Sequence, residues 1–99
     1  MPVNIRRLLV EALKPRETSI LELSEALCSV EGVEEVDAVV TDVDVKTETM
    51  KLTIKGPNIS YSDLMKVMED HSIAIKGVDE VSIVKVKPPP KLPSKEASG

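Results

Sequence analysis

Asp42 and Asp44 are the residues of this chain whose type and spacing come closest to a chemical site. They lie in an acidic segment, residues 31–48, which holds seven carboxylates against the single base Lys46. On a strand, side chains two residues apart project from the same face, about 7 Å apart along the chain. Ca²⁺ and other hard divalent cations bind several oxygens of this kind, and a neighbouring subunit could supply the rest. Asp42 and Asp44 are therefore candidate metal ligands, with Ca²⁺ or another divalent cation as the ion.

The same aspartates have a simpler interpretation as solvated or paired charges. A hairpin that closes between Asp44 and Thr49 would set Asp42 opposite Lys51, which is an ordinary cross-strand ion pair. The sequence leaves both interpretations open.

The remaining reactive side chains are expected to be structural. His71 is the single histidine and lies at the end of a predicted helix, where the helix dipole favours a cation. Cys28 follows an apolar stripe and is expected to be a small core residue, and Tyr61 is expected to pack at a helix start. No spacing pairs a nucleophile with a base, as covalent or acid–base catalysis requires. We therefore expect a protein that is not an enzyme.

The elements that must position these residues form a tandem pattern. The segment 32–36, Gly-Val-Glu-Glu-Val, returns at 77–81 as Gly-Val-Asp-Glu-Val, and each copy follows a helix-like segment that begins with a serine. Each copy is interpreted as a helix cap followed by the start of a strand. Two βαβ-like halves predict an α+β fold, the ferredoxin-like βαββαβ sandwich, with a four-stranded antiparallel sheet and two helices on one face.

Capping residues and hydrophobic periodicity set the predicted element bounds. Ser19 with Glu22, and Ser60 with Asp63, have the spacing of capping boxes, and Gly32 is expected to end the first helix. Lys14-Pro15 should end the first strand, because proline cannot donate to a ladder. The expected strands are 5–13, 36–45, 49–55 and 78–87, and the expected helical stripes contain Ile20, Leu23, Leu27 and Val30 in the first helix and Tyr61, Leu64, Met65 and Met68 in the second.

Several predicted strands carry apolar residues in both registers. In the first strand, Leu8, Val10 and Ala12 alternate with Ile5, Leu9 and Leu13. The sequence does not decide which set faces the helices. Either choice leaves apolar surface on the open face or the edge strands, and such surface commonly marks a subunit interface. We therefore expect a homo-oligomer.

Composition limits the possible partners. The chain has a net charge of −4, but residues 85–99 carry four lysines against one glutamate, so the remaining nine basic and sixteen acidic residues give −7. An acidic body repels phosphate backbones, which argues against nucleic acid as a partner. No apolar run approaches the roughly 18 residues of a membrane span, and a single cysteine fits a reducing cytoplasm. We expect one domain over residues 1–87, followed by a disordered Pro/Lys-rich tail over 88–99.

Taken together, several segments resemble an archaeal family known as domain of unknown function 211. The resemblance covers about residues 3–84 and is carried by IRRLLVEALKP, Ser-Ile-Leu-Glu-Leu, EGVEEVD, Thr47-Glu48-Thr49 with Lys-Leu-Thr-Ile-Lys-Gly, Ile59-Ser60-Tyr61 and the second Gly-Val repeat. It implies a ferredoxin-like fold, ring-shaped homo-oligomers and no established activity. Members often have histidine where this chain has Lys76, so no role that depends on that histidine is carried over.

These observations predict an uncharacterised, cytoplasmic, non-enzymatic protein that assembles into ring-like homo-oligomers and binds divalent cations through acidic residues. The alternative is a small-molecule sensing module resembling ACT regulatory domains, with an unknown ligand. A cation response without an organic ligand would favour the first function. A thermal shift with an amino acid or a similar metabolite would favour the second.

Overall fold

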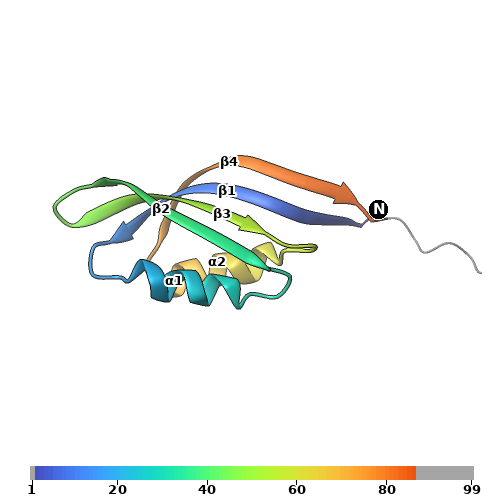
Figure 1. Cartoon of the computed structure of the whole chain (residues 1–99), viewed down its shortest axis with the longest axis horizontal. Coiled ribbons are helices and arrows are strands. Elements are labelled where there is room, and N and C mark those ends of the chain that lie inside the picture. The colour runs from blue at the N-terminus through green and yellow to red at the C-terminus, as the bar shows by residue number, and fades with distance from the viewer. Residues whose placement is uncertain (1, 87–99) are drawn as a thin grey trace, which may run out of the picture.

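The chain folds into one antiparallel sheet backed by two helices. The computed structural model describes residues 2–86, so the predicted tail over 88–99 and its boundary at 87 lie outside the described residues. The sheet order is β2-β3-β1-β4. Both helices lie beneath the same face of the sheet (Figure 1), which confirms the ferredoxin-like βαββαβ prediction. The elements are β1 Val3–Pro15, α1 Ile20–Cys28, β2 Glu35–Val43, β3 Thr47–Lys55, α2 Tyr61–Asp70 and β4 Ala74–Lys85.

An aliphatic core fills the space between the sheet and the helices. On β1 the register that faces this core is Leu8, Val10 and Ala12, so Leu9 and Leu13 belong to the open face. The helices contribute apolar residues that recur four positions apart, which places them on one stripe. The fully buried residues from the other elements are Met50, Leu52 and Ile54 of β3, Leu23 and Leu27 of α1, and Leu64 of α2, with Met68 almost fully buried.

The two predicted capping boxes differ in the structure. Ser19 Oγ accepts the backbone N–H of Glu22 at 3.2 Å, which confirms the cap of α1. Ser60 makes no side-chain hydrogen bond to the backbone of α2; its Oγ lies 3.0 Å from Oδ2 of Asp63 and donates to that carboxylate instead. The second capping box is therefore wrong in its hydrogen bonding, although α2 begins one residue after Ser60 as expected.

The two Gly-Val repeats occupy different positions in the fold. Helix α1 ends at Cys28, so Gly32, with φ of 84°, lies in the following loop and does not cap the helix. Gly77 lies inside β4, which already begins at Ala74 after a turn in which Ser72 has φ of 60°. The first copy does lead into a strand, because β2 begins at Glu35. The interpretation of both glycines as helix caps is wrong, and so is the strand start of the second copy, because the chain enters β4 three residues before it.

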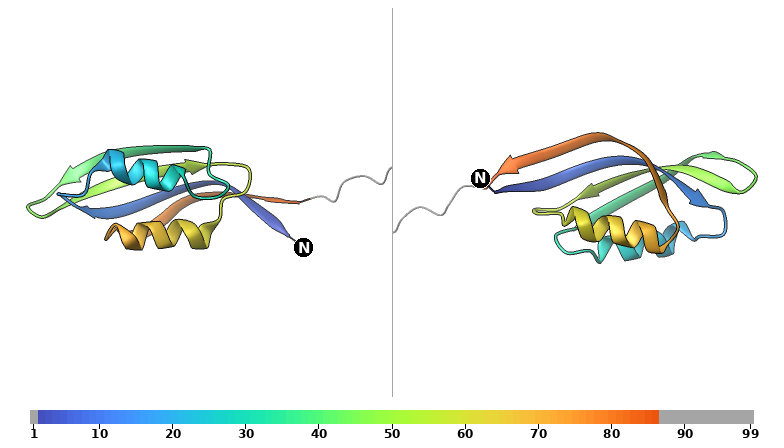
Figure 2. Two further views of the ribbon diagram at one scale, coloured as in Figure 1. Left: turned by 90° about the horizontal axis from the view of Figure 1, so that it is seen from below. Right: turned by 180° about the vertical axis from the view of Figure 1, so that it is seen from behind.

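The sheet is longer than the helical layer. The start of β1 and the end of β4 run together past the helices as a two-stranded ribbon, and the β2–β3 hairpin extends in the opposite direction (Figures 1 and 2). Over the described residues, neither helix has the length and apolar character needed to cross a bilayer. The ends of the sheet therefore lack the cover that the helices give its middle.

Candidate functional site

The predicted metal ligands lie at the end of the β2–β3 hairpin. The hairpin closes between Asp44 and Thr47, which places Asp42 opposite Thr49. A β-bulge at Thr41 lies beyond this pair, and Lys51 pairs with Val39. The expected cross-strand pair of Asp42 with Lys51 is therefore wrong, because the hairpin closes at Thr47, two residues before the expected Thr49. The extra residue of the bulge then shifts the register of Lys51 by one further position. Asp44 follows β2, and its Oδ1 accepts the backbone N–H of Val45 at 2.8 Å. Among residues 2–86, no group of three or more His, Cys, Asp or Glu side chains is arranged to hold a metal ion.

Of the other candidate residues, His71 lies at a helix end as expected, whereas Cys28 and Tyr61 are not buried. His71 is the C-cap residue of α2, and its Nδ1 lies 2.9 Å from the carbonyl oxygen of Val67. Cys28 is exposed, so the expectation of a core residue is wrong. The buried stripe of α1 ends at Leu27, and the next residue is turned about 100° away from it. Tyr61, at the first position of α2, is also exposed and is not a packing residue.

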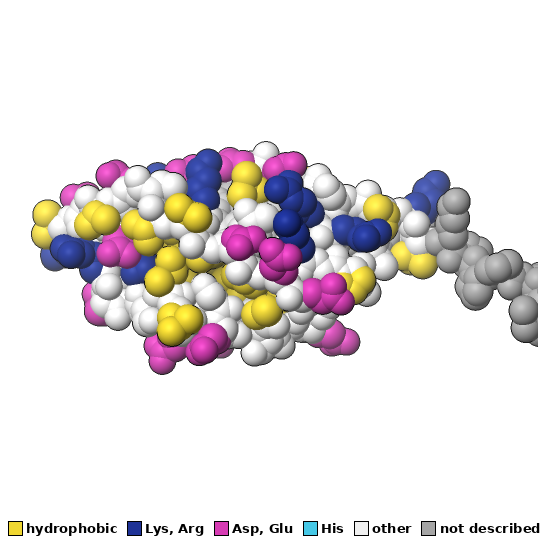
Figure 3. All heavy atoms as spheres, viewed as in Figure 1, with side chains coloured by type: hydrophobic (Ala, Val, Ile, Leu, Met, Phe, Trp, Pro, Cys, Tyr) yellow, Lys and Arg dark blue, Asp and Glu magenta, His cyan; other side chains and the backbone are white. Residues whose placement is uncertain are grey.

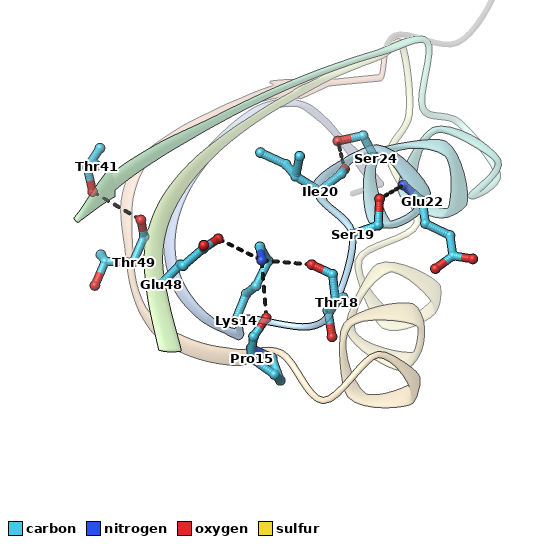
Figure 4. Close-up of polar contacts among 10 residues, drawn as sticks. All are labelled: Lys14, Pro15, Thr18, Ser19, Ile20, Glu22, Ser24, Thr41, Glu48 and Thr49. Carbon is cyan, nitrogen blue, oxygen red and sulfur yellow. Dashed lines mark hydrogen bonds and ion pairs between the residues drawn. The ribbon is translucent and has the colours of Figure 1, made fainter. Parts of the chain in front are cut away.

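Lys14 is a buried charge that the sequence analysis missed. Its Nζ donates to the Thr18 carbonyl at 2.7 Å and to the Pro15 carbonyl at 3.1 Å, and it lies 2.7 Å from Oε1 of Glu48 (Figure 4). The side chain joins the β1–α1 turn to β3 and is only 2% exposed. Its position two residues after Ala12, in the inward register of β1, was the available signal. The contacts satisfy the ammonium group, which makes Lys14 a structural residue.

Two ion pairs lie on the open face of the sheet. Arg7 Nη1 is 2.6 Å from Oε2 of Glu80, and Lys51 Nζ is 3.0 Å from Oδ2 of Asp79. The hydrogen bond from Lys51 to Asp79, with the attraction of the same carboxylate, raises the pKa of Lys51 above its ordinary value of 10.5. Asp79 is the extra residue of a bulge in β4. Both β4 carboxylates are thus occupied by basic residues of their own chain.

Exposed apolar side chains gather on both edge strands. Because β2 and β4 form the edges of the sheet, each has one side without a strand partner among the described residues. In Figure 3, hydrophobic side chains are visible over the β2–β3 side of the molecule. The exposed apolar residues are Val39, Val43 and Val45 in or just after β2, and Val78, Val81, Ile83 and Val84 on β4.

A charged hollow is lined by residues of β1, β3, β4 and the start of β2, at the end of the sheet that is nearer the N-terminus. Its volume is about 530 Å³. Basic and acidic side chains lie next to one another toward this end of the molecule (Figure 3). The lining residues are Arg6, Arg7, Glu34, Glu35, Lys55, Gly56, Pro57, Ser82 and Val84. No motif marked the hollow in the sequence, because its residues come from four separate segments.

Comparison with known proteins identifies a family and a relative of this chain. The profile of DUF211, a family described as uncharacterized ArCR, matches residues 6–86. An uncharacterized protein of Methanocaldococcus jannaschii is 32% identical over 78 residues, which span 79% of this chain and 80% of the relative. Neither description names an activity, a ligand or an assembly.

Proposed function

Because the chain belongs to the uncharacterised archaeal family DUF211, we propose its role from its own surface: a non-enzymatic protein that assembles into ring-like homo-oligomers. The observation that supports this proposal is the exposed apolar surface on both edge strands. Val39 of β2 is 56% exposed and Ile83 of β4 is 51% exposed. An edge strand with free backbone groups and apolar side chains is a template for pairing with another chain.

The two edges are different surfaces, and this favours a head-to-tail contact. A contact between β2 of one copy and β4 of the next uses two different patches, so it repeats from copy to copy and closes into a ring when the rotation permits. A contact between two β4 strands would instead end at a dimer. The proposed contact therefore gives more than two subunits.

The charges of the two edges also favour this arrangement. The β2 side is acidic, while the carboxylates of β4 already pair with Arg7 and Lys51 of their own chain. Lys76 and Lys85 of β4 have no ion-pair partner among the described residues. Two β2 edges would set acidic residues against acidic residues, whereas β2 against β4 allows attraction. The acidic residues of the β2 side that lie outside the charged hollow are Asp37, Asp42 and Asp44.

Complementation between two variants tests the head-to-tail contact. Val39→Lys should block the β2 edge and Ile83→Lys the β4 edge, because each buries a charge at the contact. Each variant alone should be a monomer by size-exclusion chromatography with light scattering. Mixed together, they should form a dimer through the one intact edge of each. Leu21→Lys on α1, at a residue 66% exposed but away from both edges, is the matched control and should assemble like the wild type.

The outcomes separate the possible contacts. A wild-type chain that is monomeric at micromolar concentration would refute self-assembly. Assembly of the Val39→Lys variant into dimers, with no complementation by the Ile83→Lys variant, would show a β4–β4 contact and refute the ring.

Divalent-cation binding is a second proposal, and it depends on the first. Asp42 belongs to the edge that we propose as a contact, where a neighbouring copy could bring further oxygens to Asp42 and Asp44. Calorimetric titration of Ca²⁺ into metal-free protein should give heat in the wild type and none in a variant with Asp42→Asn and Asp44→Asn. Absence of heat from the assembled wild type at millimolar Ca²⁺ would remove this proposal.

We also propose a cytoplasmic location. A reducing cytoplasm is supported by the single cysteine, Cys28, which is exposed and cannot form a disulfide within the chain.

The alternative role as a small-molecule sensor is supported by the charged hollow, which has the size of a ligand site. A thermal shift of the assembled protein with an amino acid would support sensing.

A further inference from the structure

We infer that the charged hollow binds a small zwitterion, a molecule with a carboxylate at one end and an ammonium group at the other. The inference gives the sensing alternative a site and a ligand class, and it does not depend on self-assembly. The hollow has a volume of about 530 Å³, which is within the range of roughly 300–1,000 Å³ typical of small-molecule sites.

Of the five charged side chains that line the hollow, Arg7 alone has an ion-pair partner within residues 2–86. Lys55 lies directly opposite Arg7 on β1 and opposite Glu35 on β2. Like charges at opposite positions of two strands are unfavourable, and Glu80 offsets only the charge of Arg7. Of the ion pairs within residues 2–86, none involves Arg6, Lys55, Glu34 or Glu35. Two cations and two carboxylates thus line one hollow without touching each other.

Arg6 and the two glutamates are separated in space, and Lys55 lies between them. Glu35 begins β2 and Glu34 precedes it, Arg6 is on β1, and β3 with Lys55 runs between these strands. Neighbouring strands are about 4.8 Å apart, so the β1 and β2 backbones lie about 10 Å apart. A linear molecule can span this gap with its ammonium group at the glutamates and its carboxylate at Arg6. The flexible side chain of Lys55, on the strand between, can reach the same carboxylate. Such charge-assisted hydrogen bonds are the strong class of polar contact.

Backbone contacts hold the segments that line the hollow in place before any ligand binds. The Gly56 N–H donates to the Arg6 carbonyl at 3.1 Å, and the Glu34 N–H donates to the Lys55 carbonyl at 2.8 Å. Gly56 has no room for a side chain, because a Cβ there would overlap the carbonyl oxygen of Gly32. These contacts join β1, β3 and the loop before β2 at the hollow. A preorganised rim lowers the entropic cost of binding.

Amide-resolved NMR of the full chain with ε-aminocaproate as the probe tests the inference. This linear zwitterion should cause saturable shifts at residues of the hollow. Caproate and hexylamine each lack one charge and should bind at least about tenfold more weakly, since each loses one set of charge-assisted contacts. Lys55→Gln and Glu35→Gln should each weaken binding to a similar extent. Lys46→Gln, in the β2–β3 turn, is the matched control and should leave binding unchanged.

Three results would overturn the inference. They are the absence of saturable shifts at the hollow, binding of caproate or inorganic phosphate as tight as that of ε-aminocaproate, and an equal loss in the Lys46→Gln variant. If Lys55→Gln fails to fold, Arg6→Gln takes its place. Light scattering on the same samples measures the oligomeric state separately from probe binding. If the protein is a monomer and still binds the probe, the ring is refuted and the binding site is retained.

Discussion

At the scale of single residues, burial decides how much a charged side chain contributes to stability. Lys14 and Lys51 both pair with carboxylates, but Lys14 is enclosed by the β1–α1 turn and β3, whereas Lys51 lies on the open face of the sheet. Removing one partner of a buried pair leaves the other charge and its hydrogen-bonding groups desolvated. A surface pair is screened by water and contributes little.

We therefore expect Lys14→Met to lower the free energy of unfolding by about 3 kcal/mol, because Glu48 and the Thr18 carbonyl lose their donor. Lys51→Met should cause a much smaller loss. Urea unfolding of both variants against the wild type measures the two effects. Equal losses of unfolding free energy in the two variants would show that the contacts of Lys14 contribute no more to stability than a surface ion pair does.

Lys51 also gives a pH prediction. Because its pKa is raised in the folded chain, its pair with Asp79 stabilises the fold below pH 10.5 and loses this effect as the pH rises through the raised value. The difference in unfolding free energy between the wild type and Lys51→Gln should be constant near neutral pH and shrink above 10.5. In an Asp79→Asn background that pH dependence should disappear. Its persistence there would assign it to another group.

At the scale of elements, two glycines fix how the loop after α1 meets the end of β3. A Cβ at Gly32 would overlap the carbonyl oxygen of Asn58, and one at Gly56 would overlap the carbonyl oxygen of Gly32. These obstacles are backbone atoms and cannot rotate away. Gly77, in the second copy of the repeat, has open space around the same position.

Alanine substitutions at the glycines of the two copies should therefore have different effects on stability. Gly56→Ala should destabilise the fold by about 1–3 kcal/mol through overpacking. Gly32→Ala should cost about 1 kcal/mol more, because its φ of 84° is unfavourable for alanine. Gly77→Ala should change stability by less than about 0.5 kcal/mol. Thermal and urea unfolding measure these effects, and a large loss at Gly77 would contradict the environment described for β4.

At the scale of the whole molecule, the sheet extends past its helical cover at both ends. The edge strands β2 and β4 also carry apolar residues that a single copy leaves in water. A chain of 99 residues buries a smaller fraction of its surface on folding than a longer one does. Association would add buried area to the folded state, and mass action then couples stability to concentration.

The unfolding temperature of the wild type should accordingly rise with protein concentration, because only the folded chain assembles. The Ile83→Lys variant should lose this dependence, while Leu21→Lys should keep it. Scanning calorimetry over a wide concentration range makes the measurement. A wild-type unfolding temperature that does not change with concentration would argue against assembly of the folded state.

The sequence by itself determined the order of elements, the ferredoxin-like class and the family, because capping serines, helical stripes and alternating strands are local patterns. Only the tertiary structure decided which register of β1 faces the helices, where the bulge at Thr41 shifts β2, and that Lys14 is buried. It also showed that the two Gly-Val copies differ, and it brought Arg6, Lys55 and Glu35 to one hollow. These features depend on pairing between residues far apart in the chain, which a local pattern does not specify.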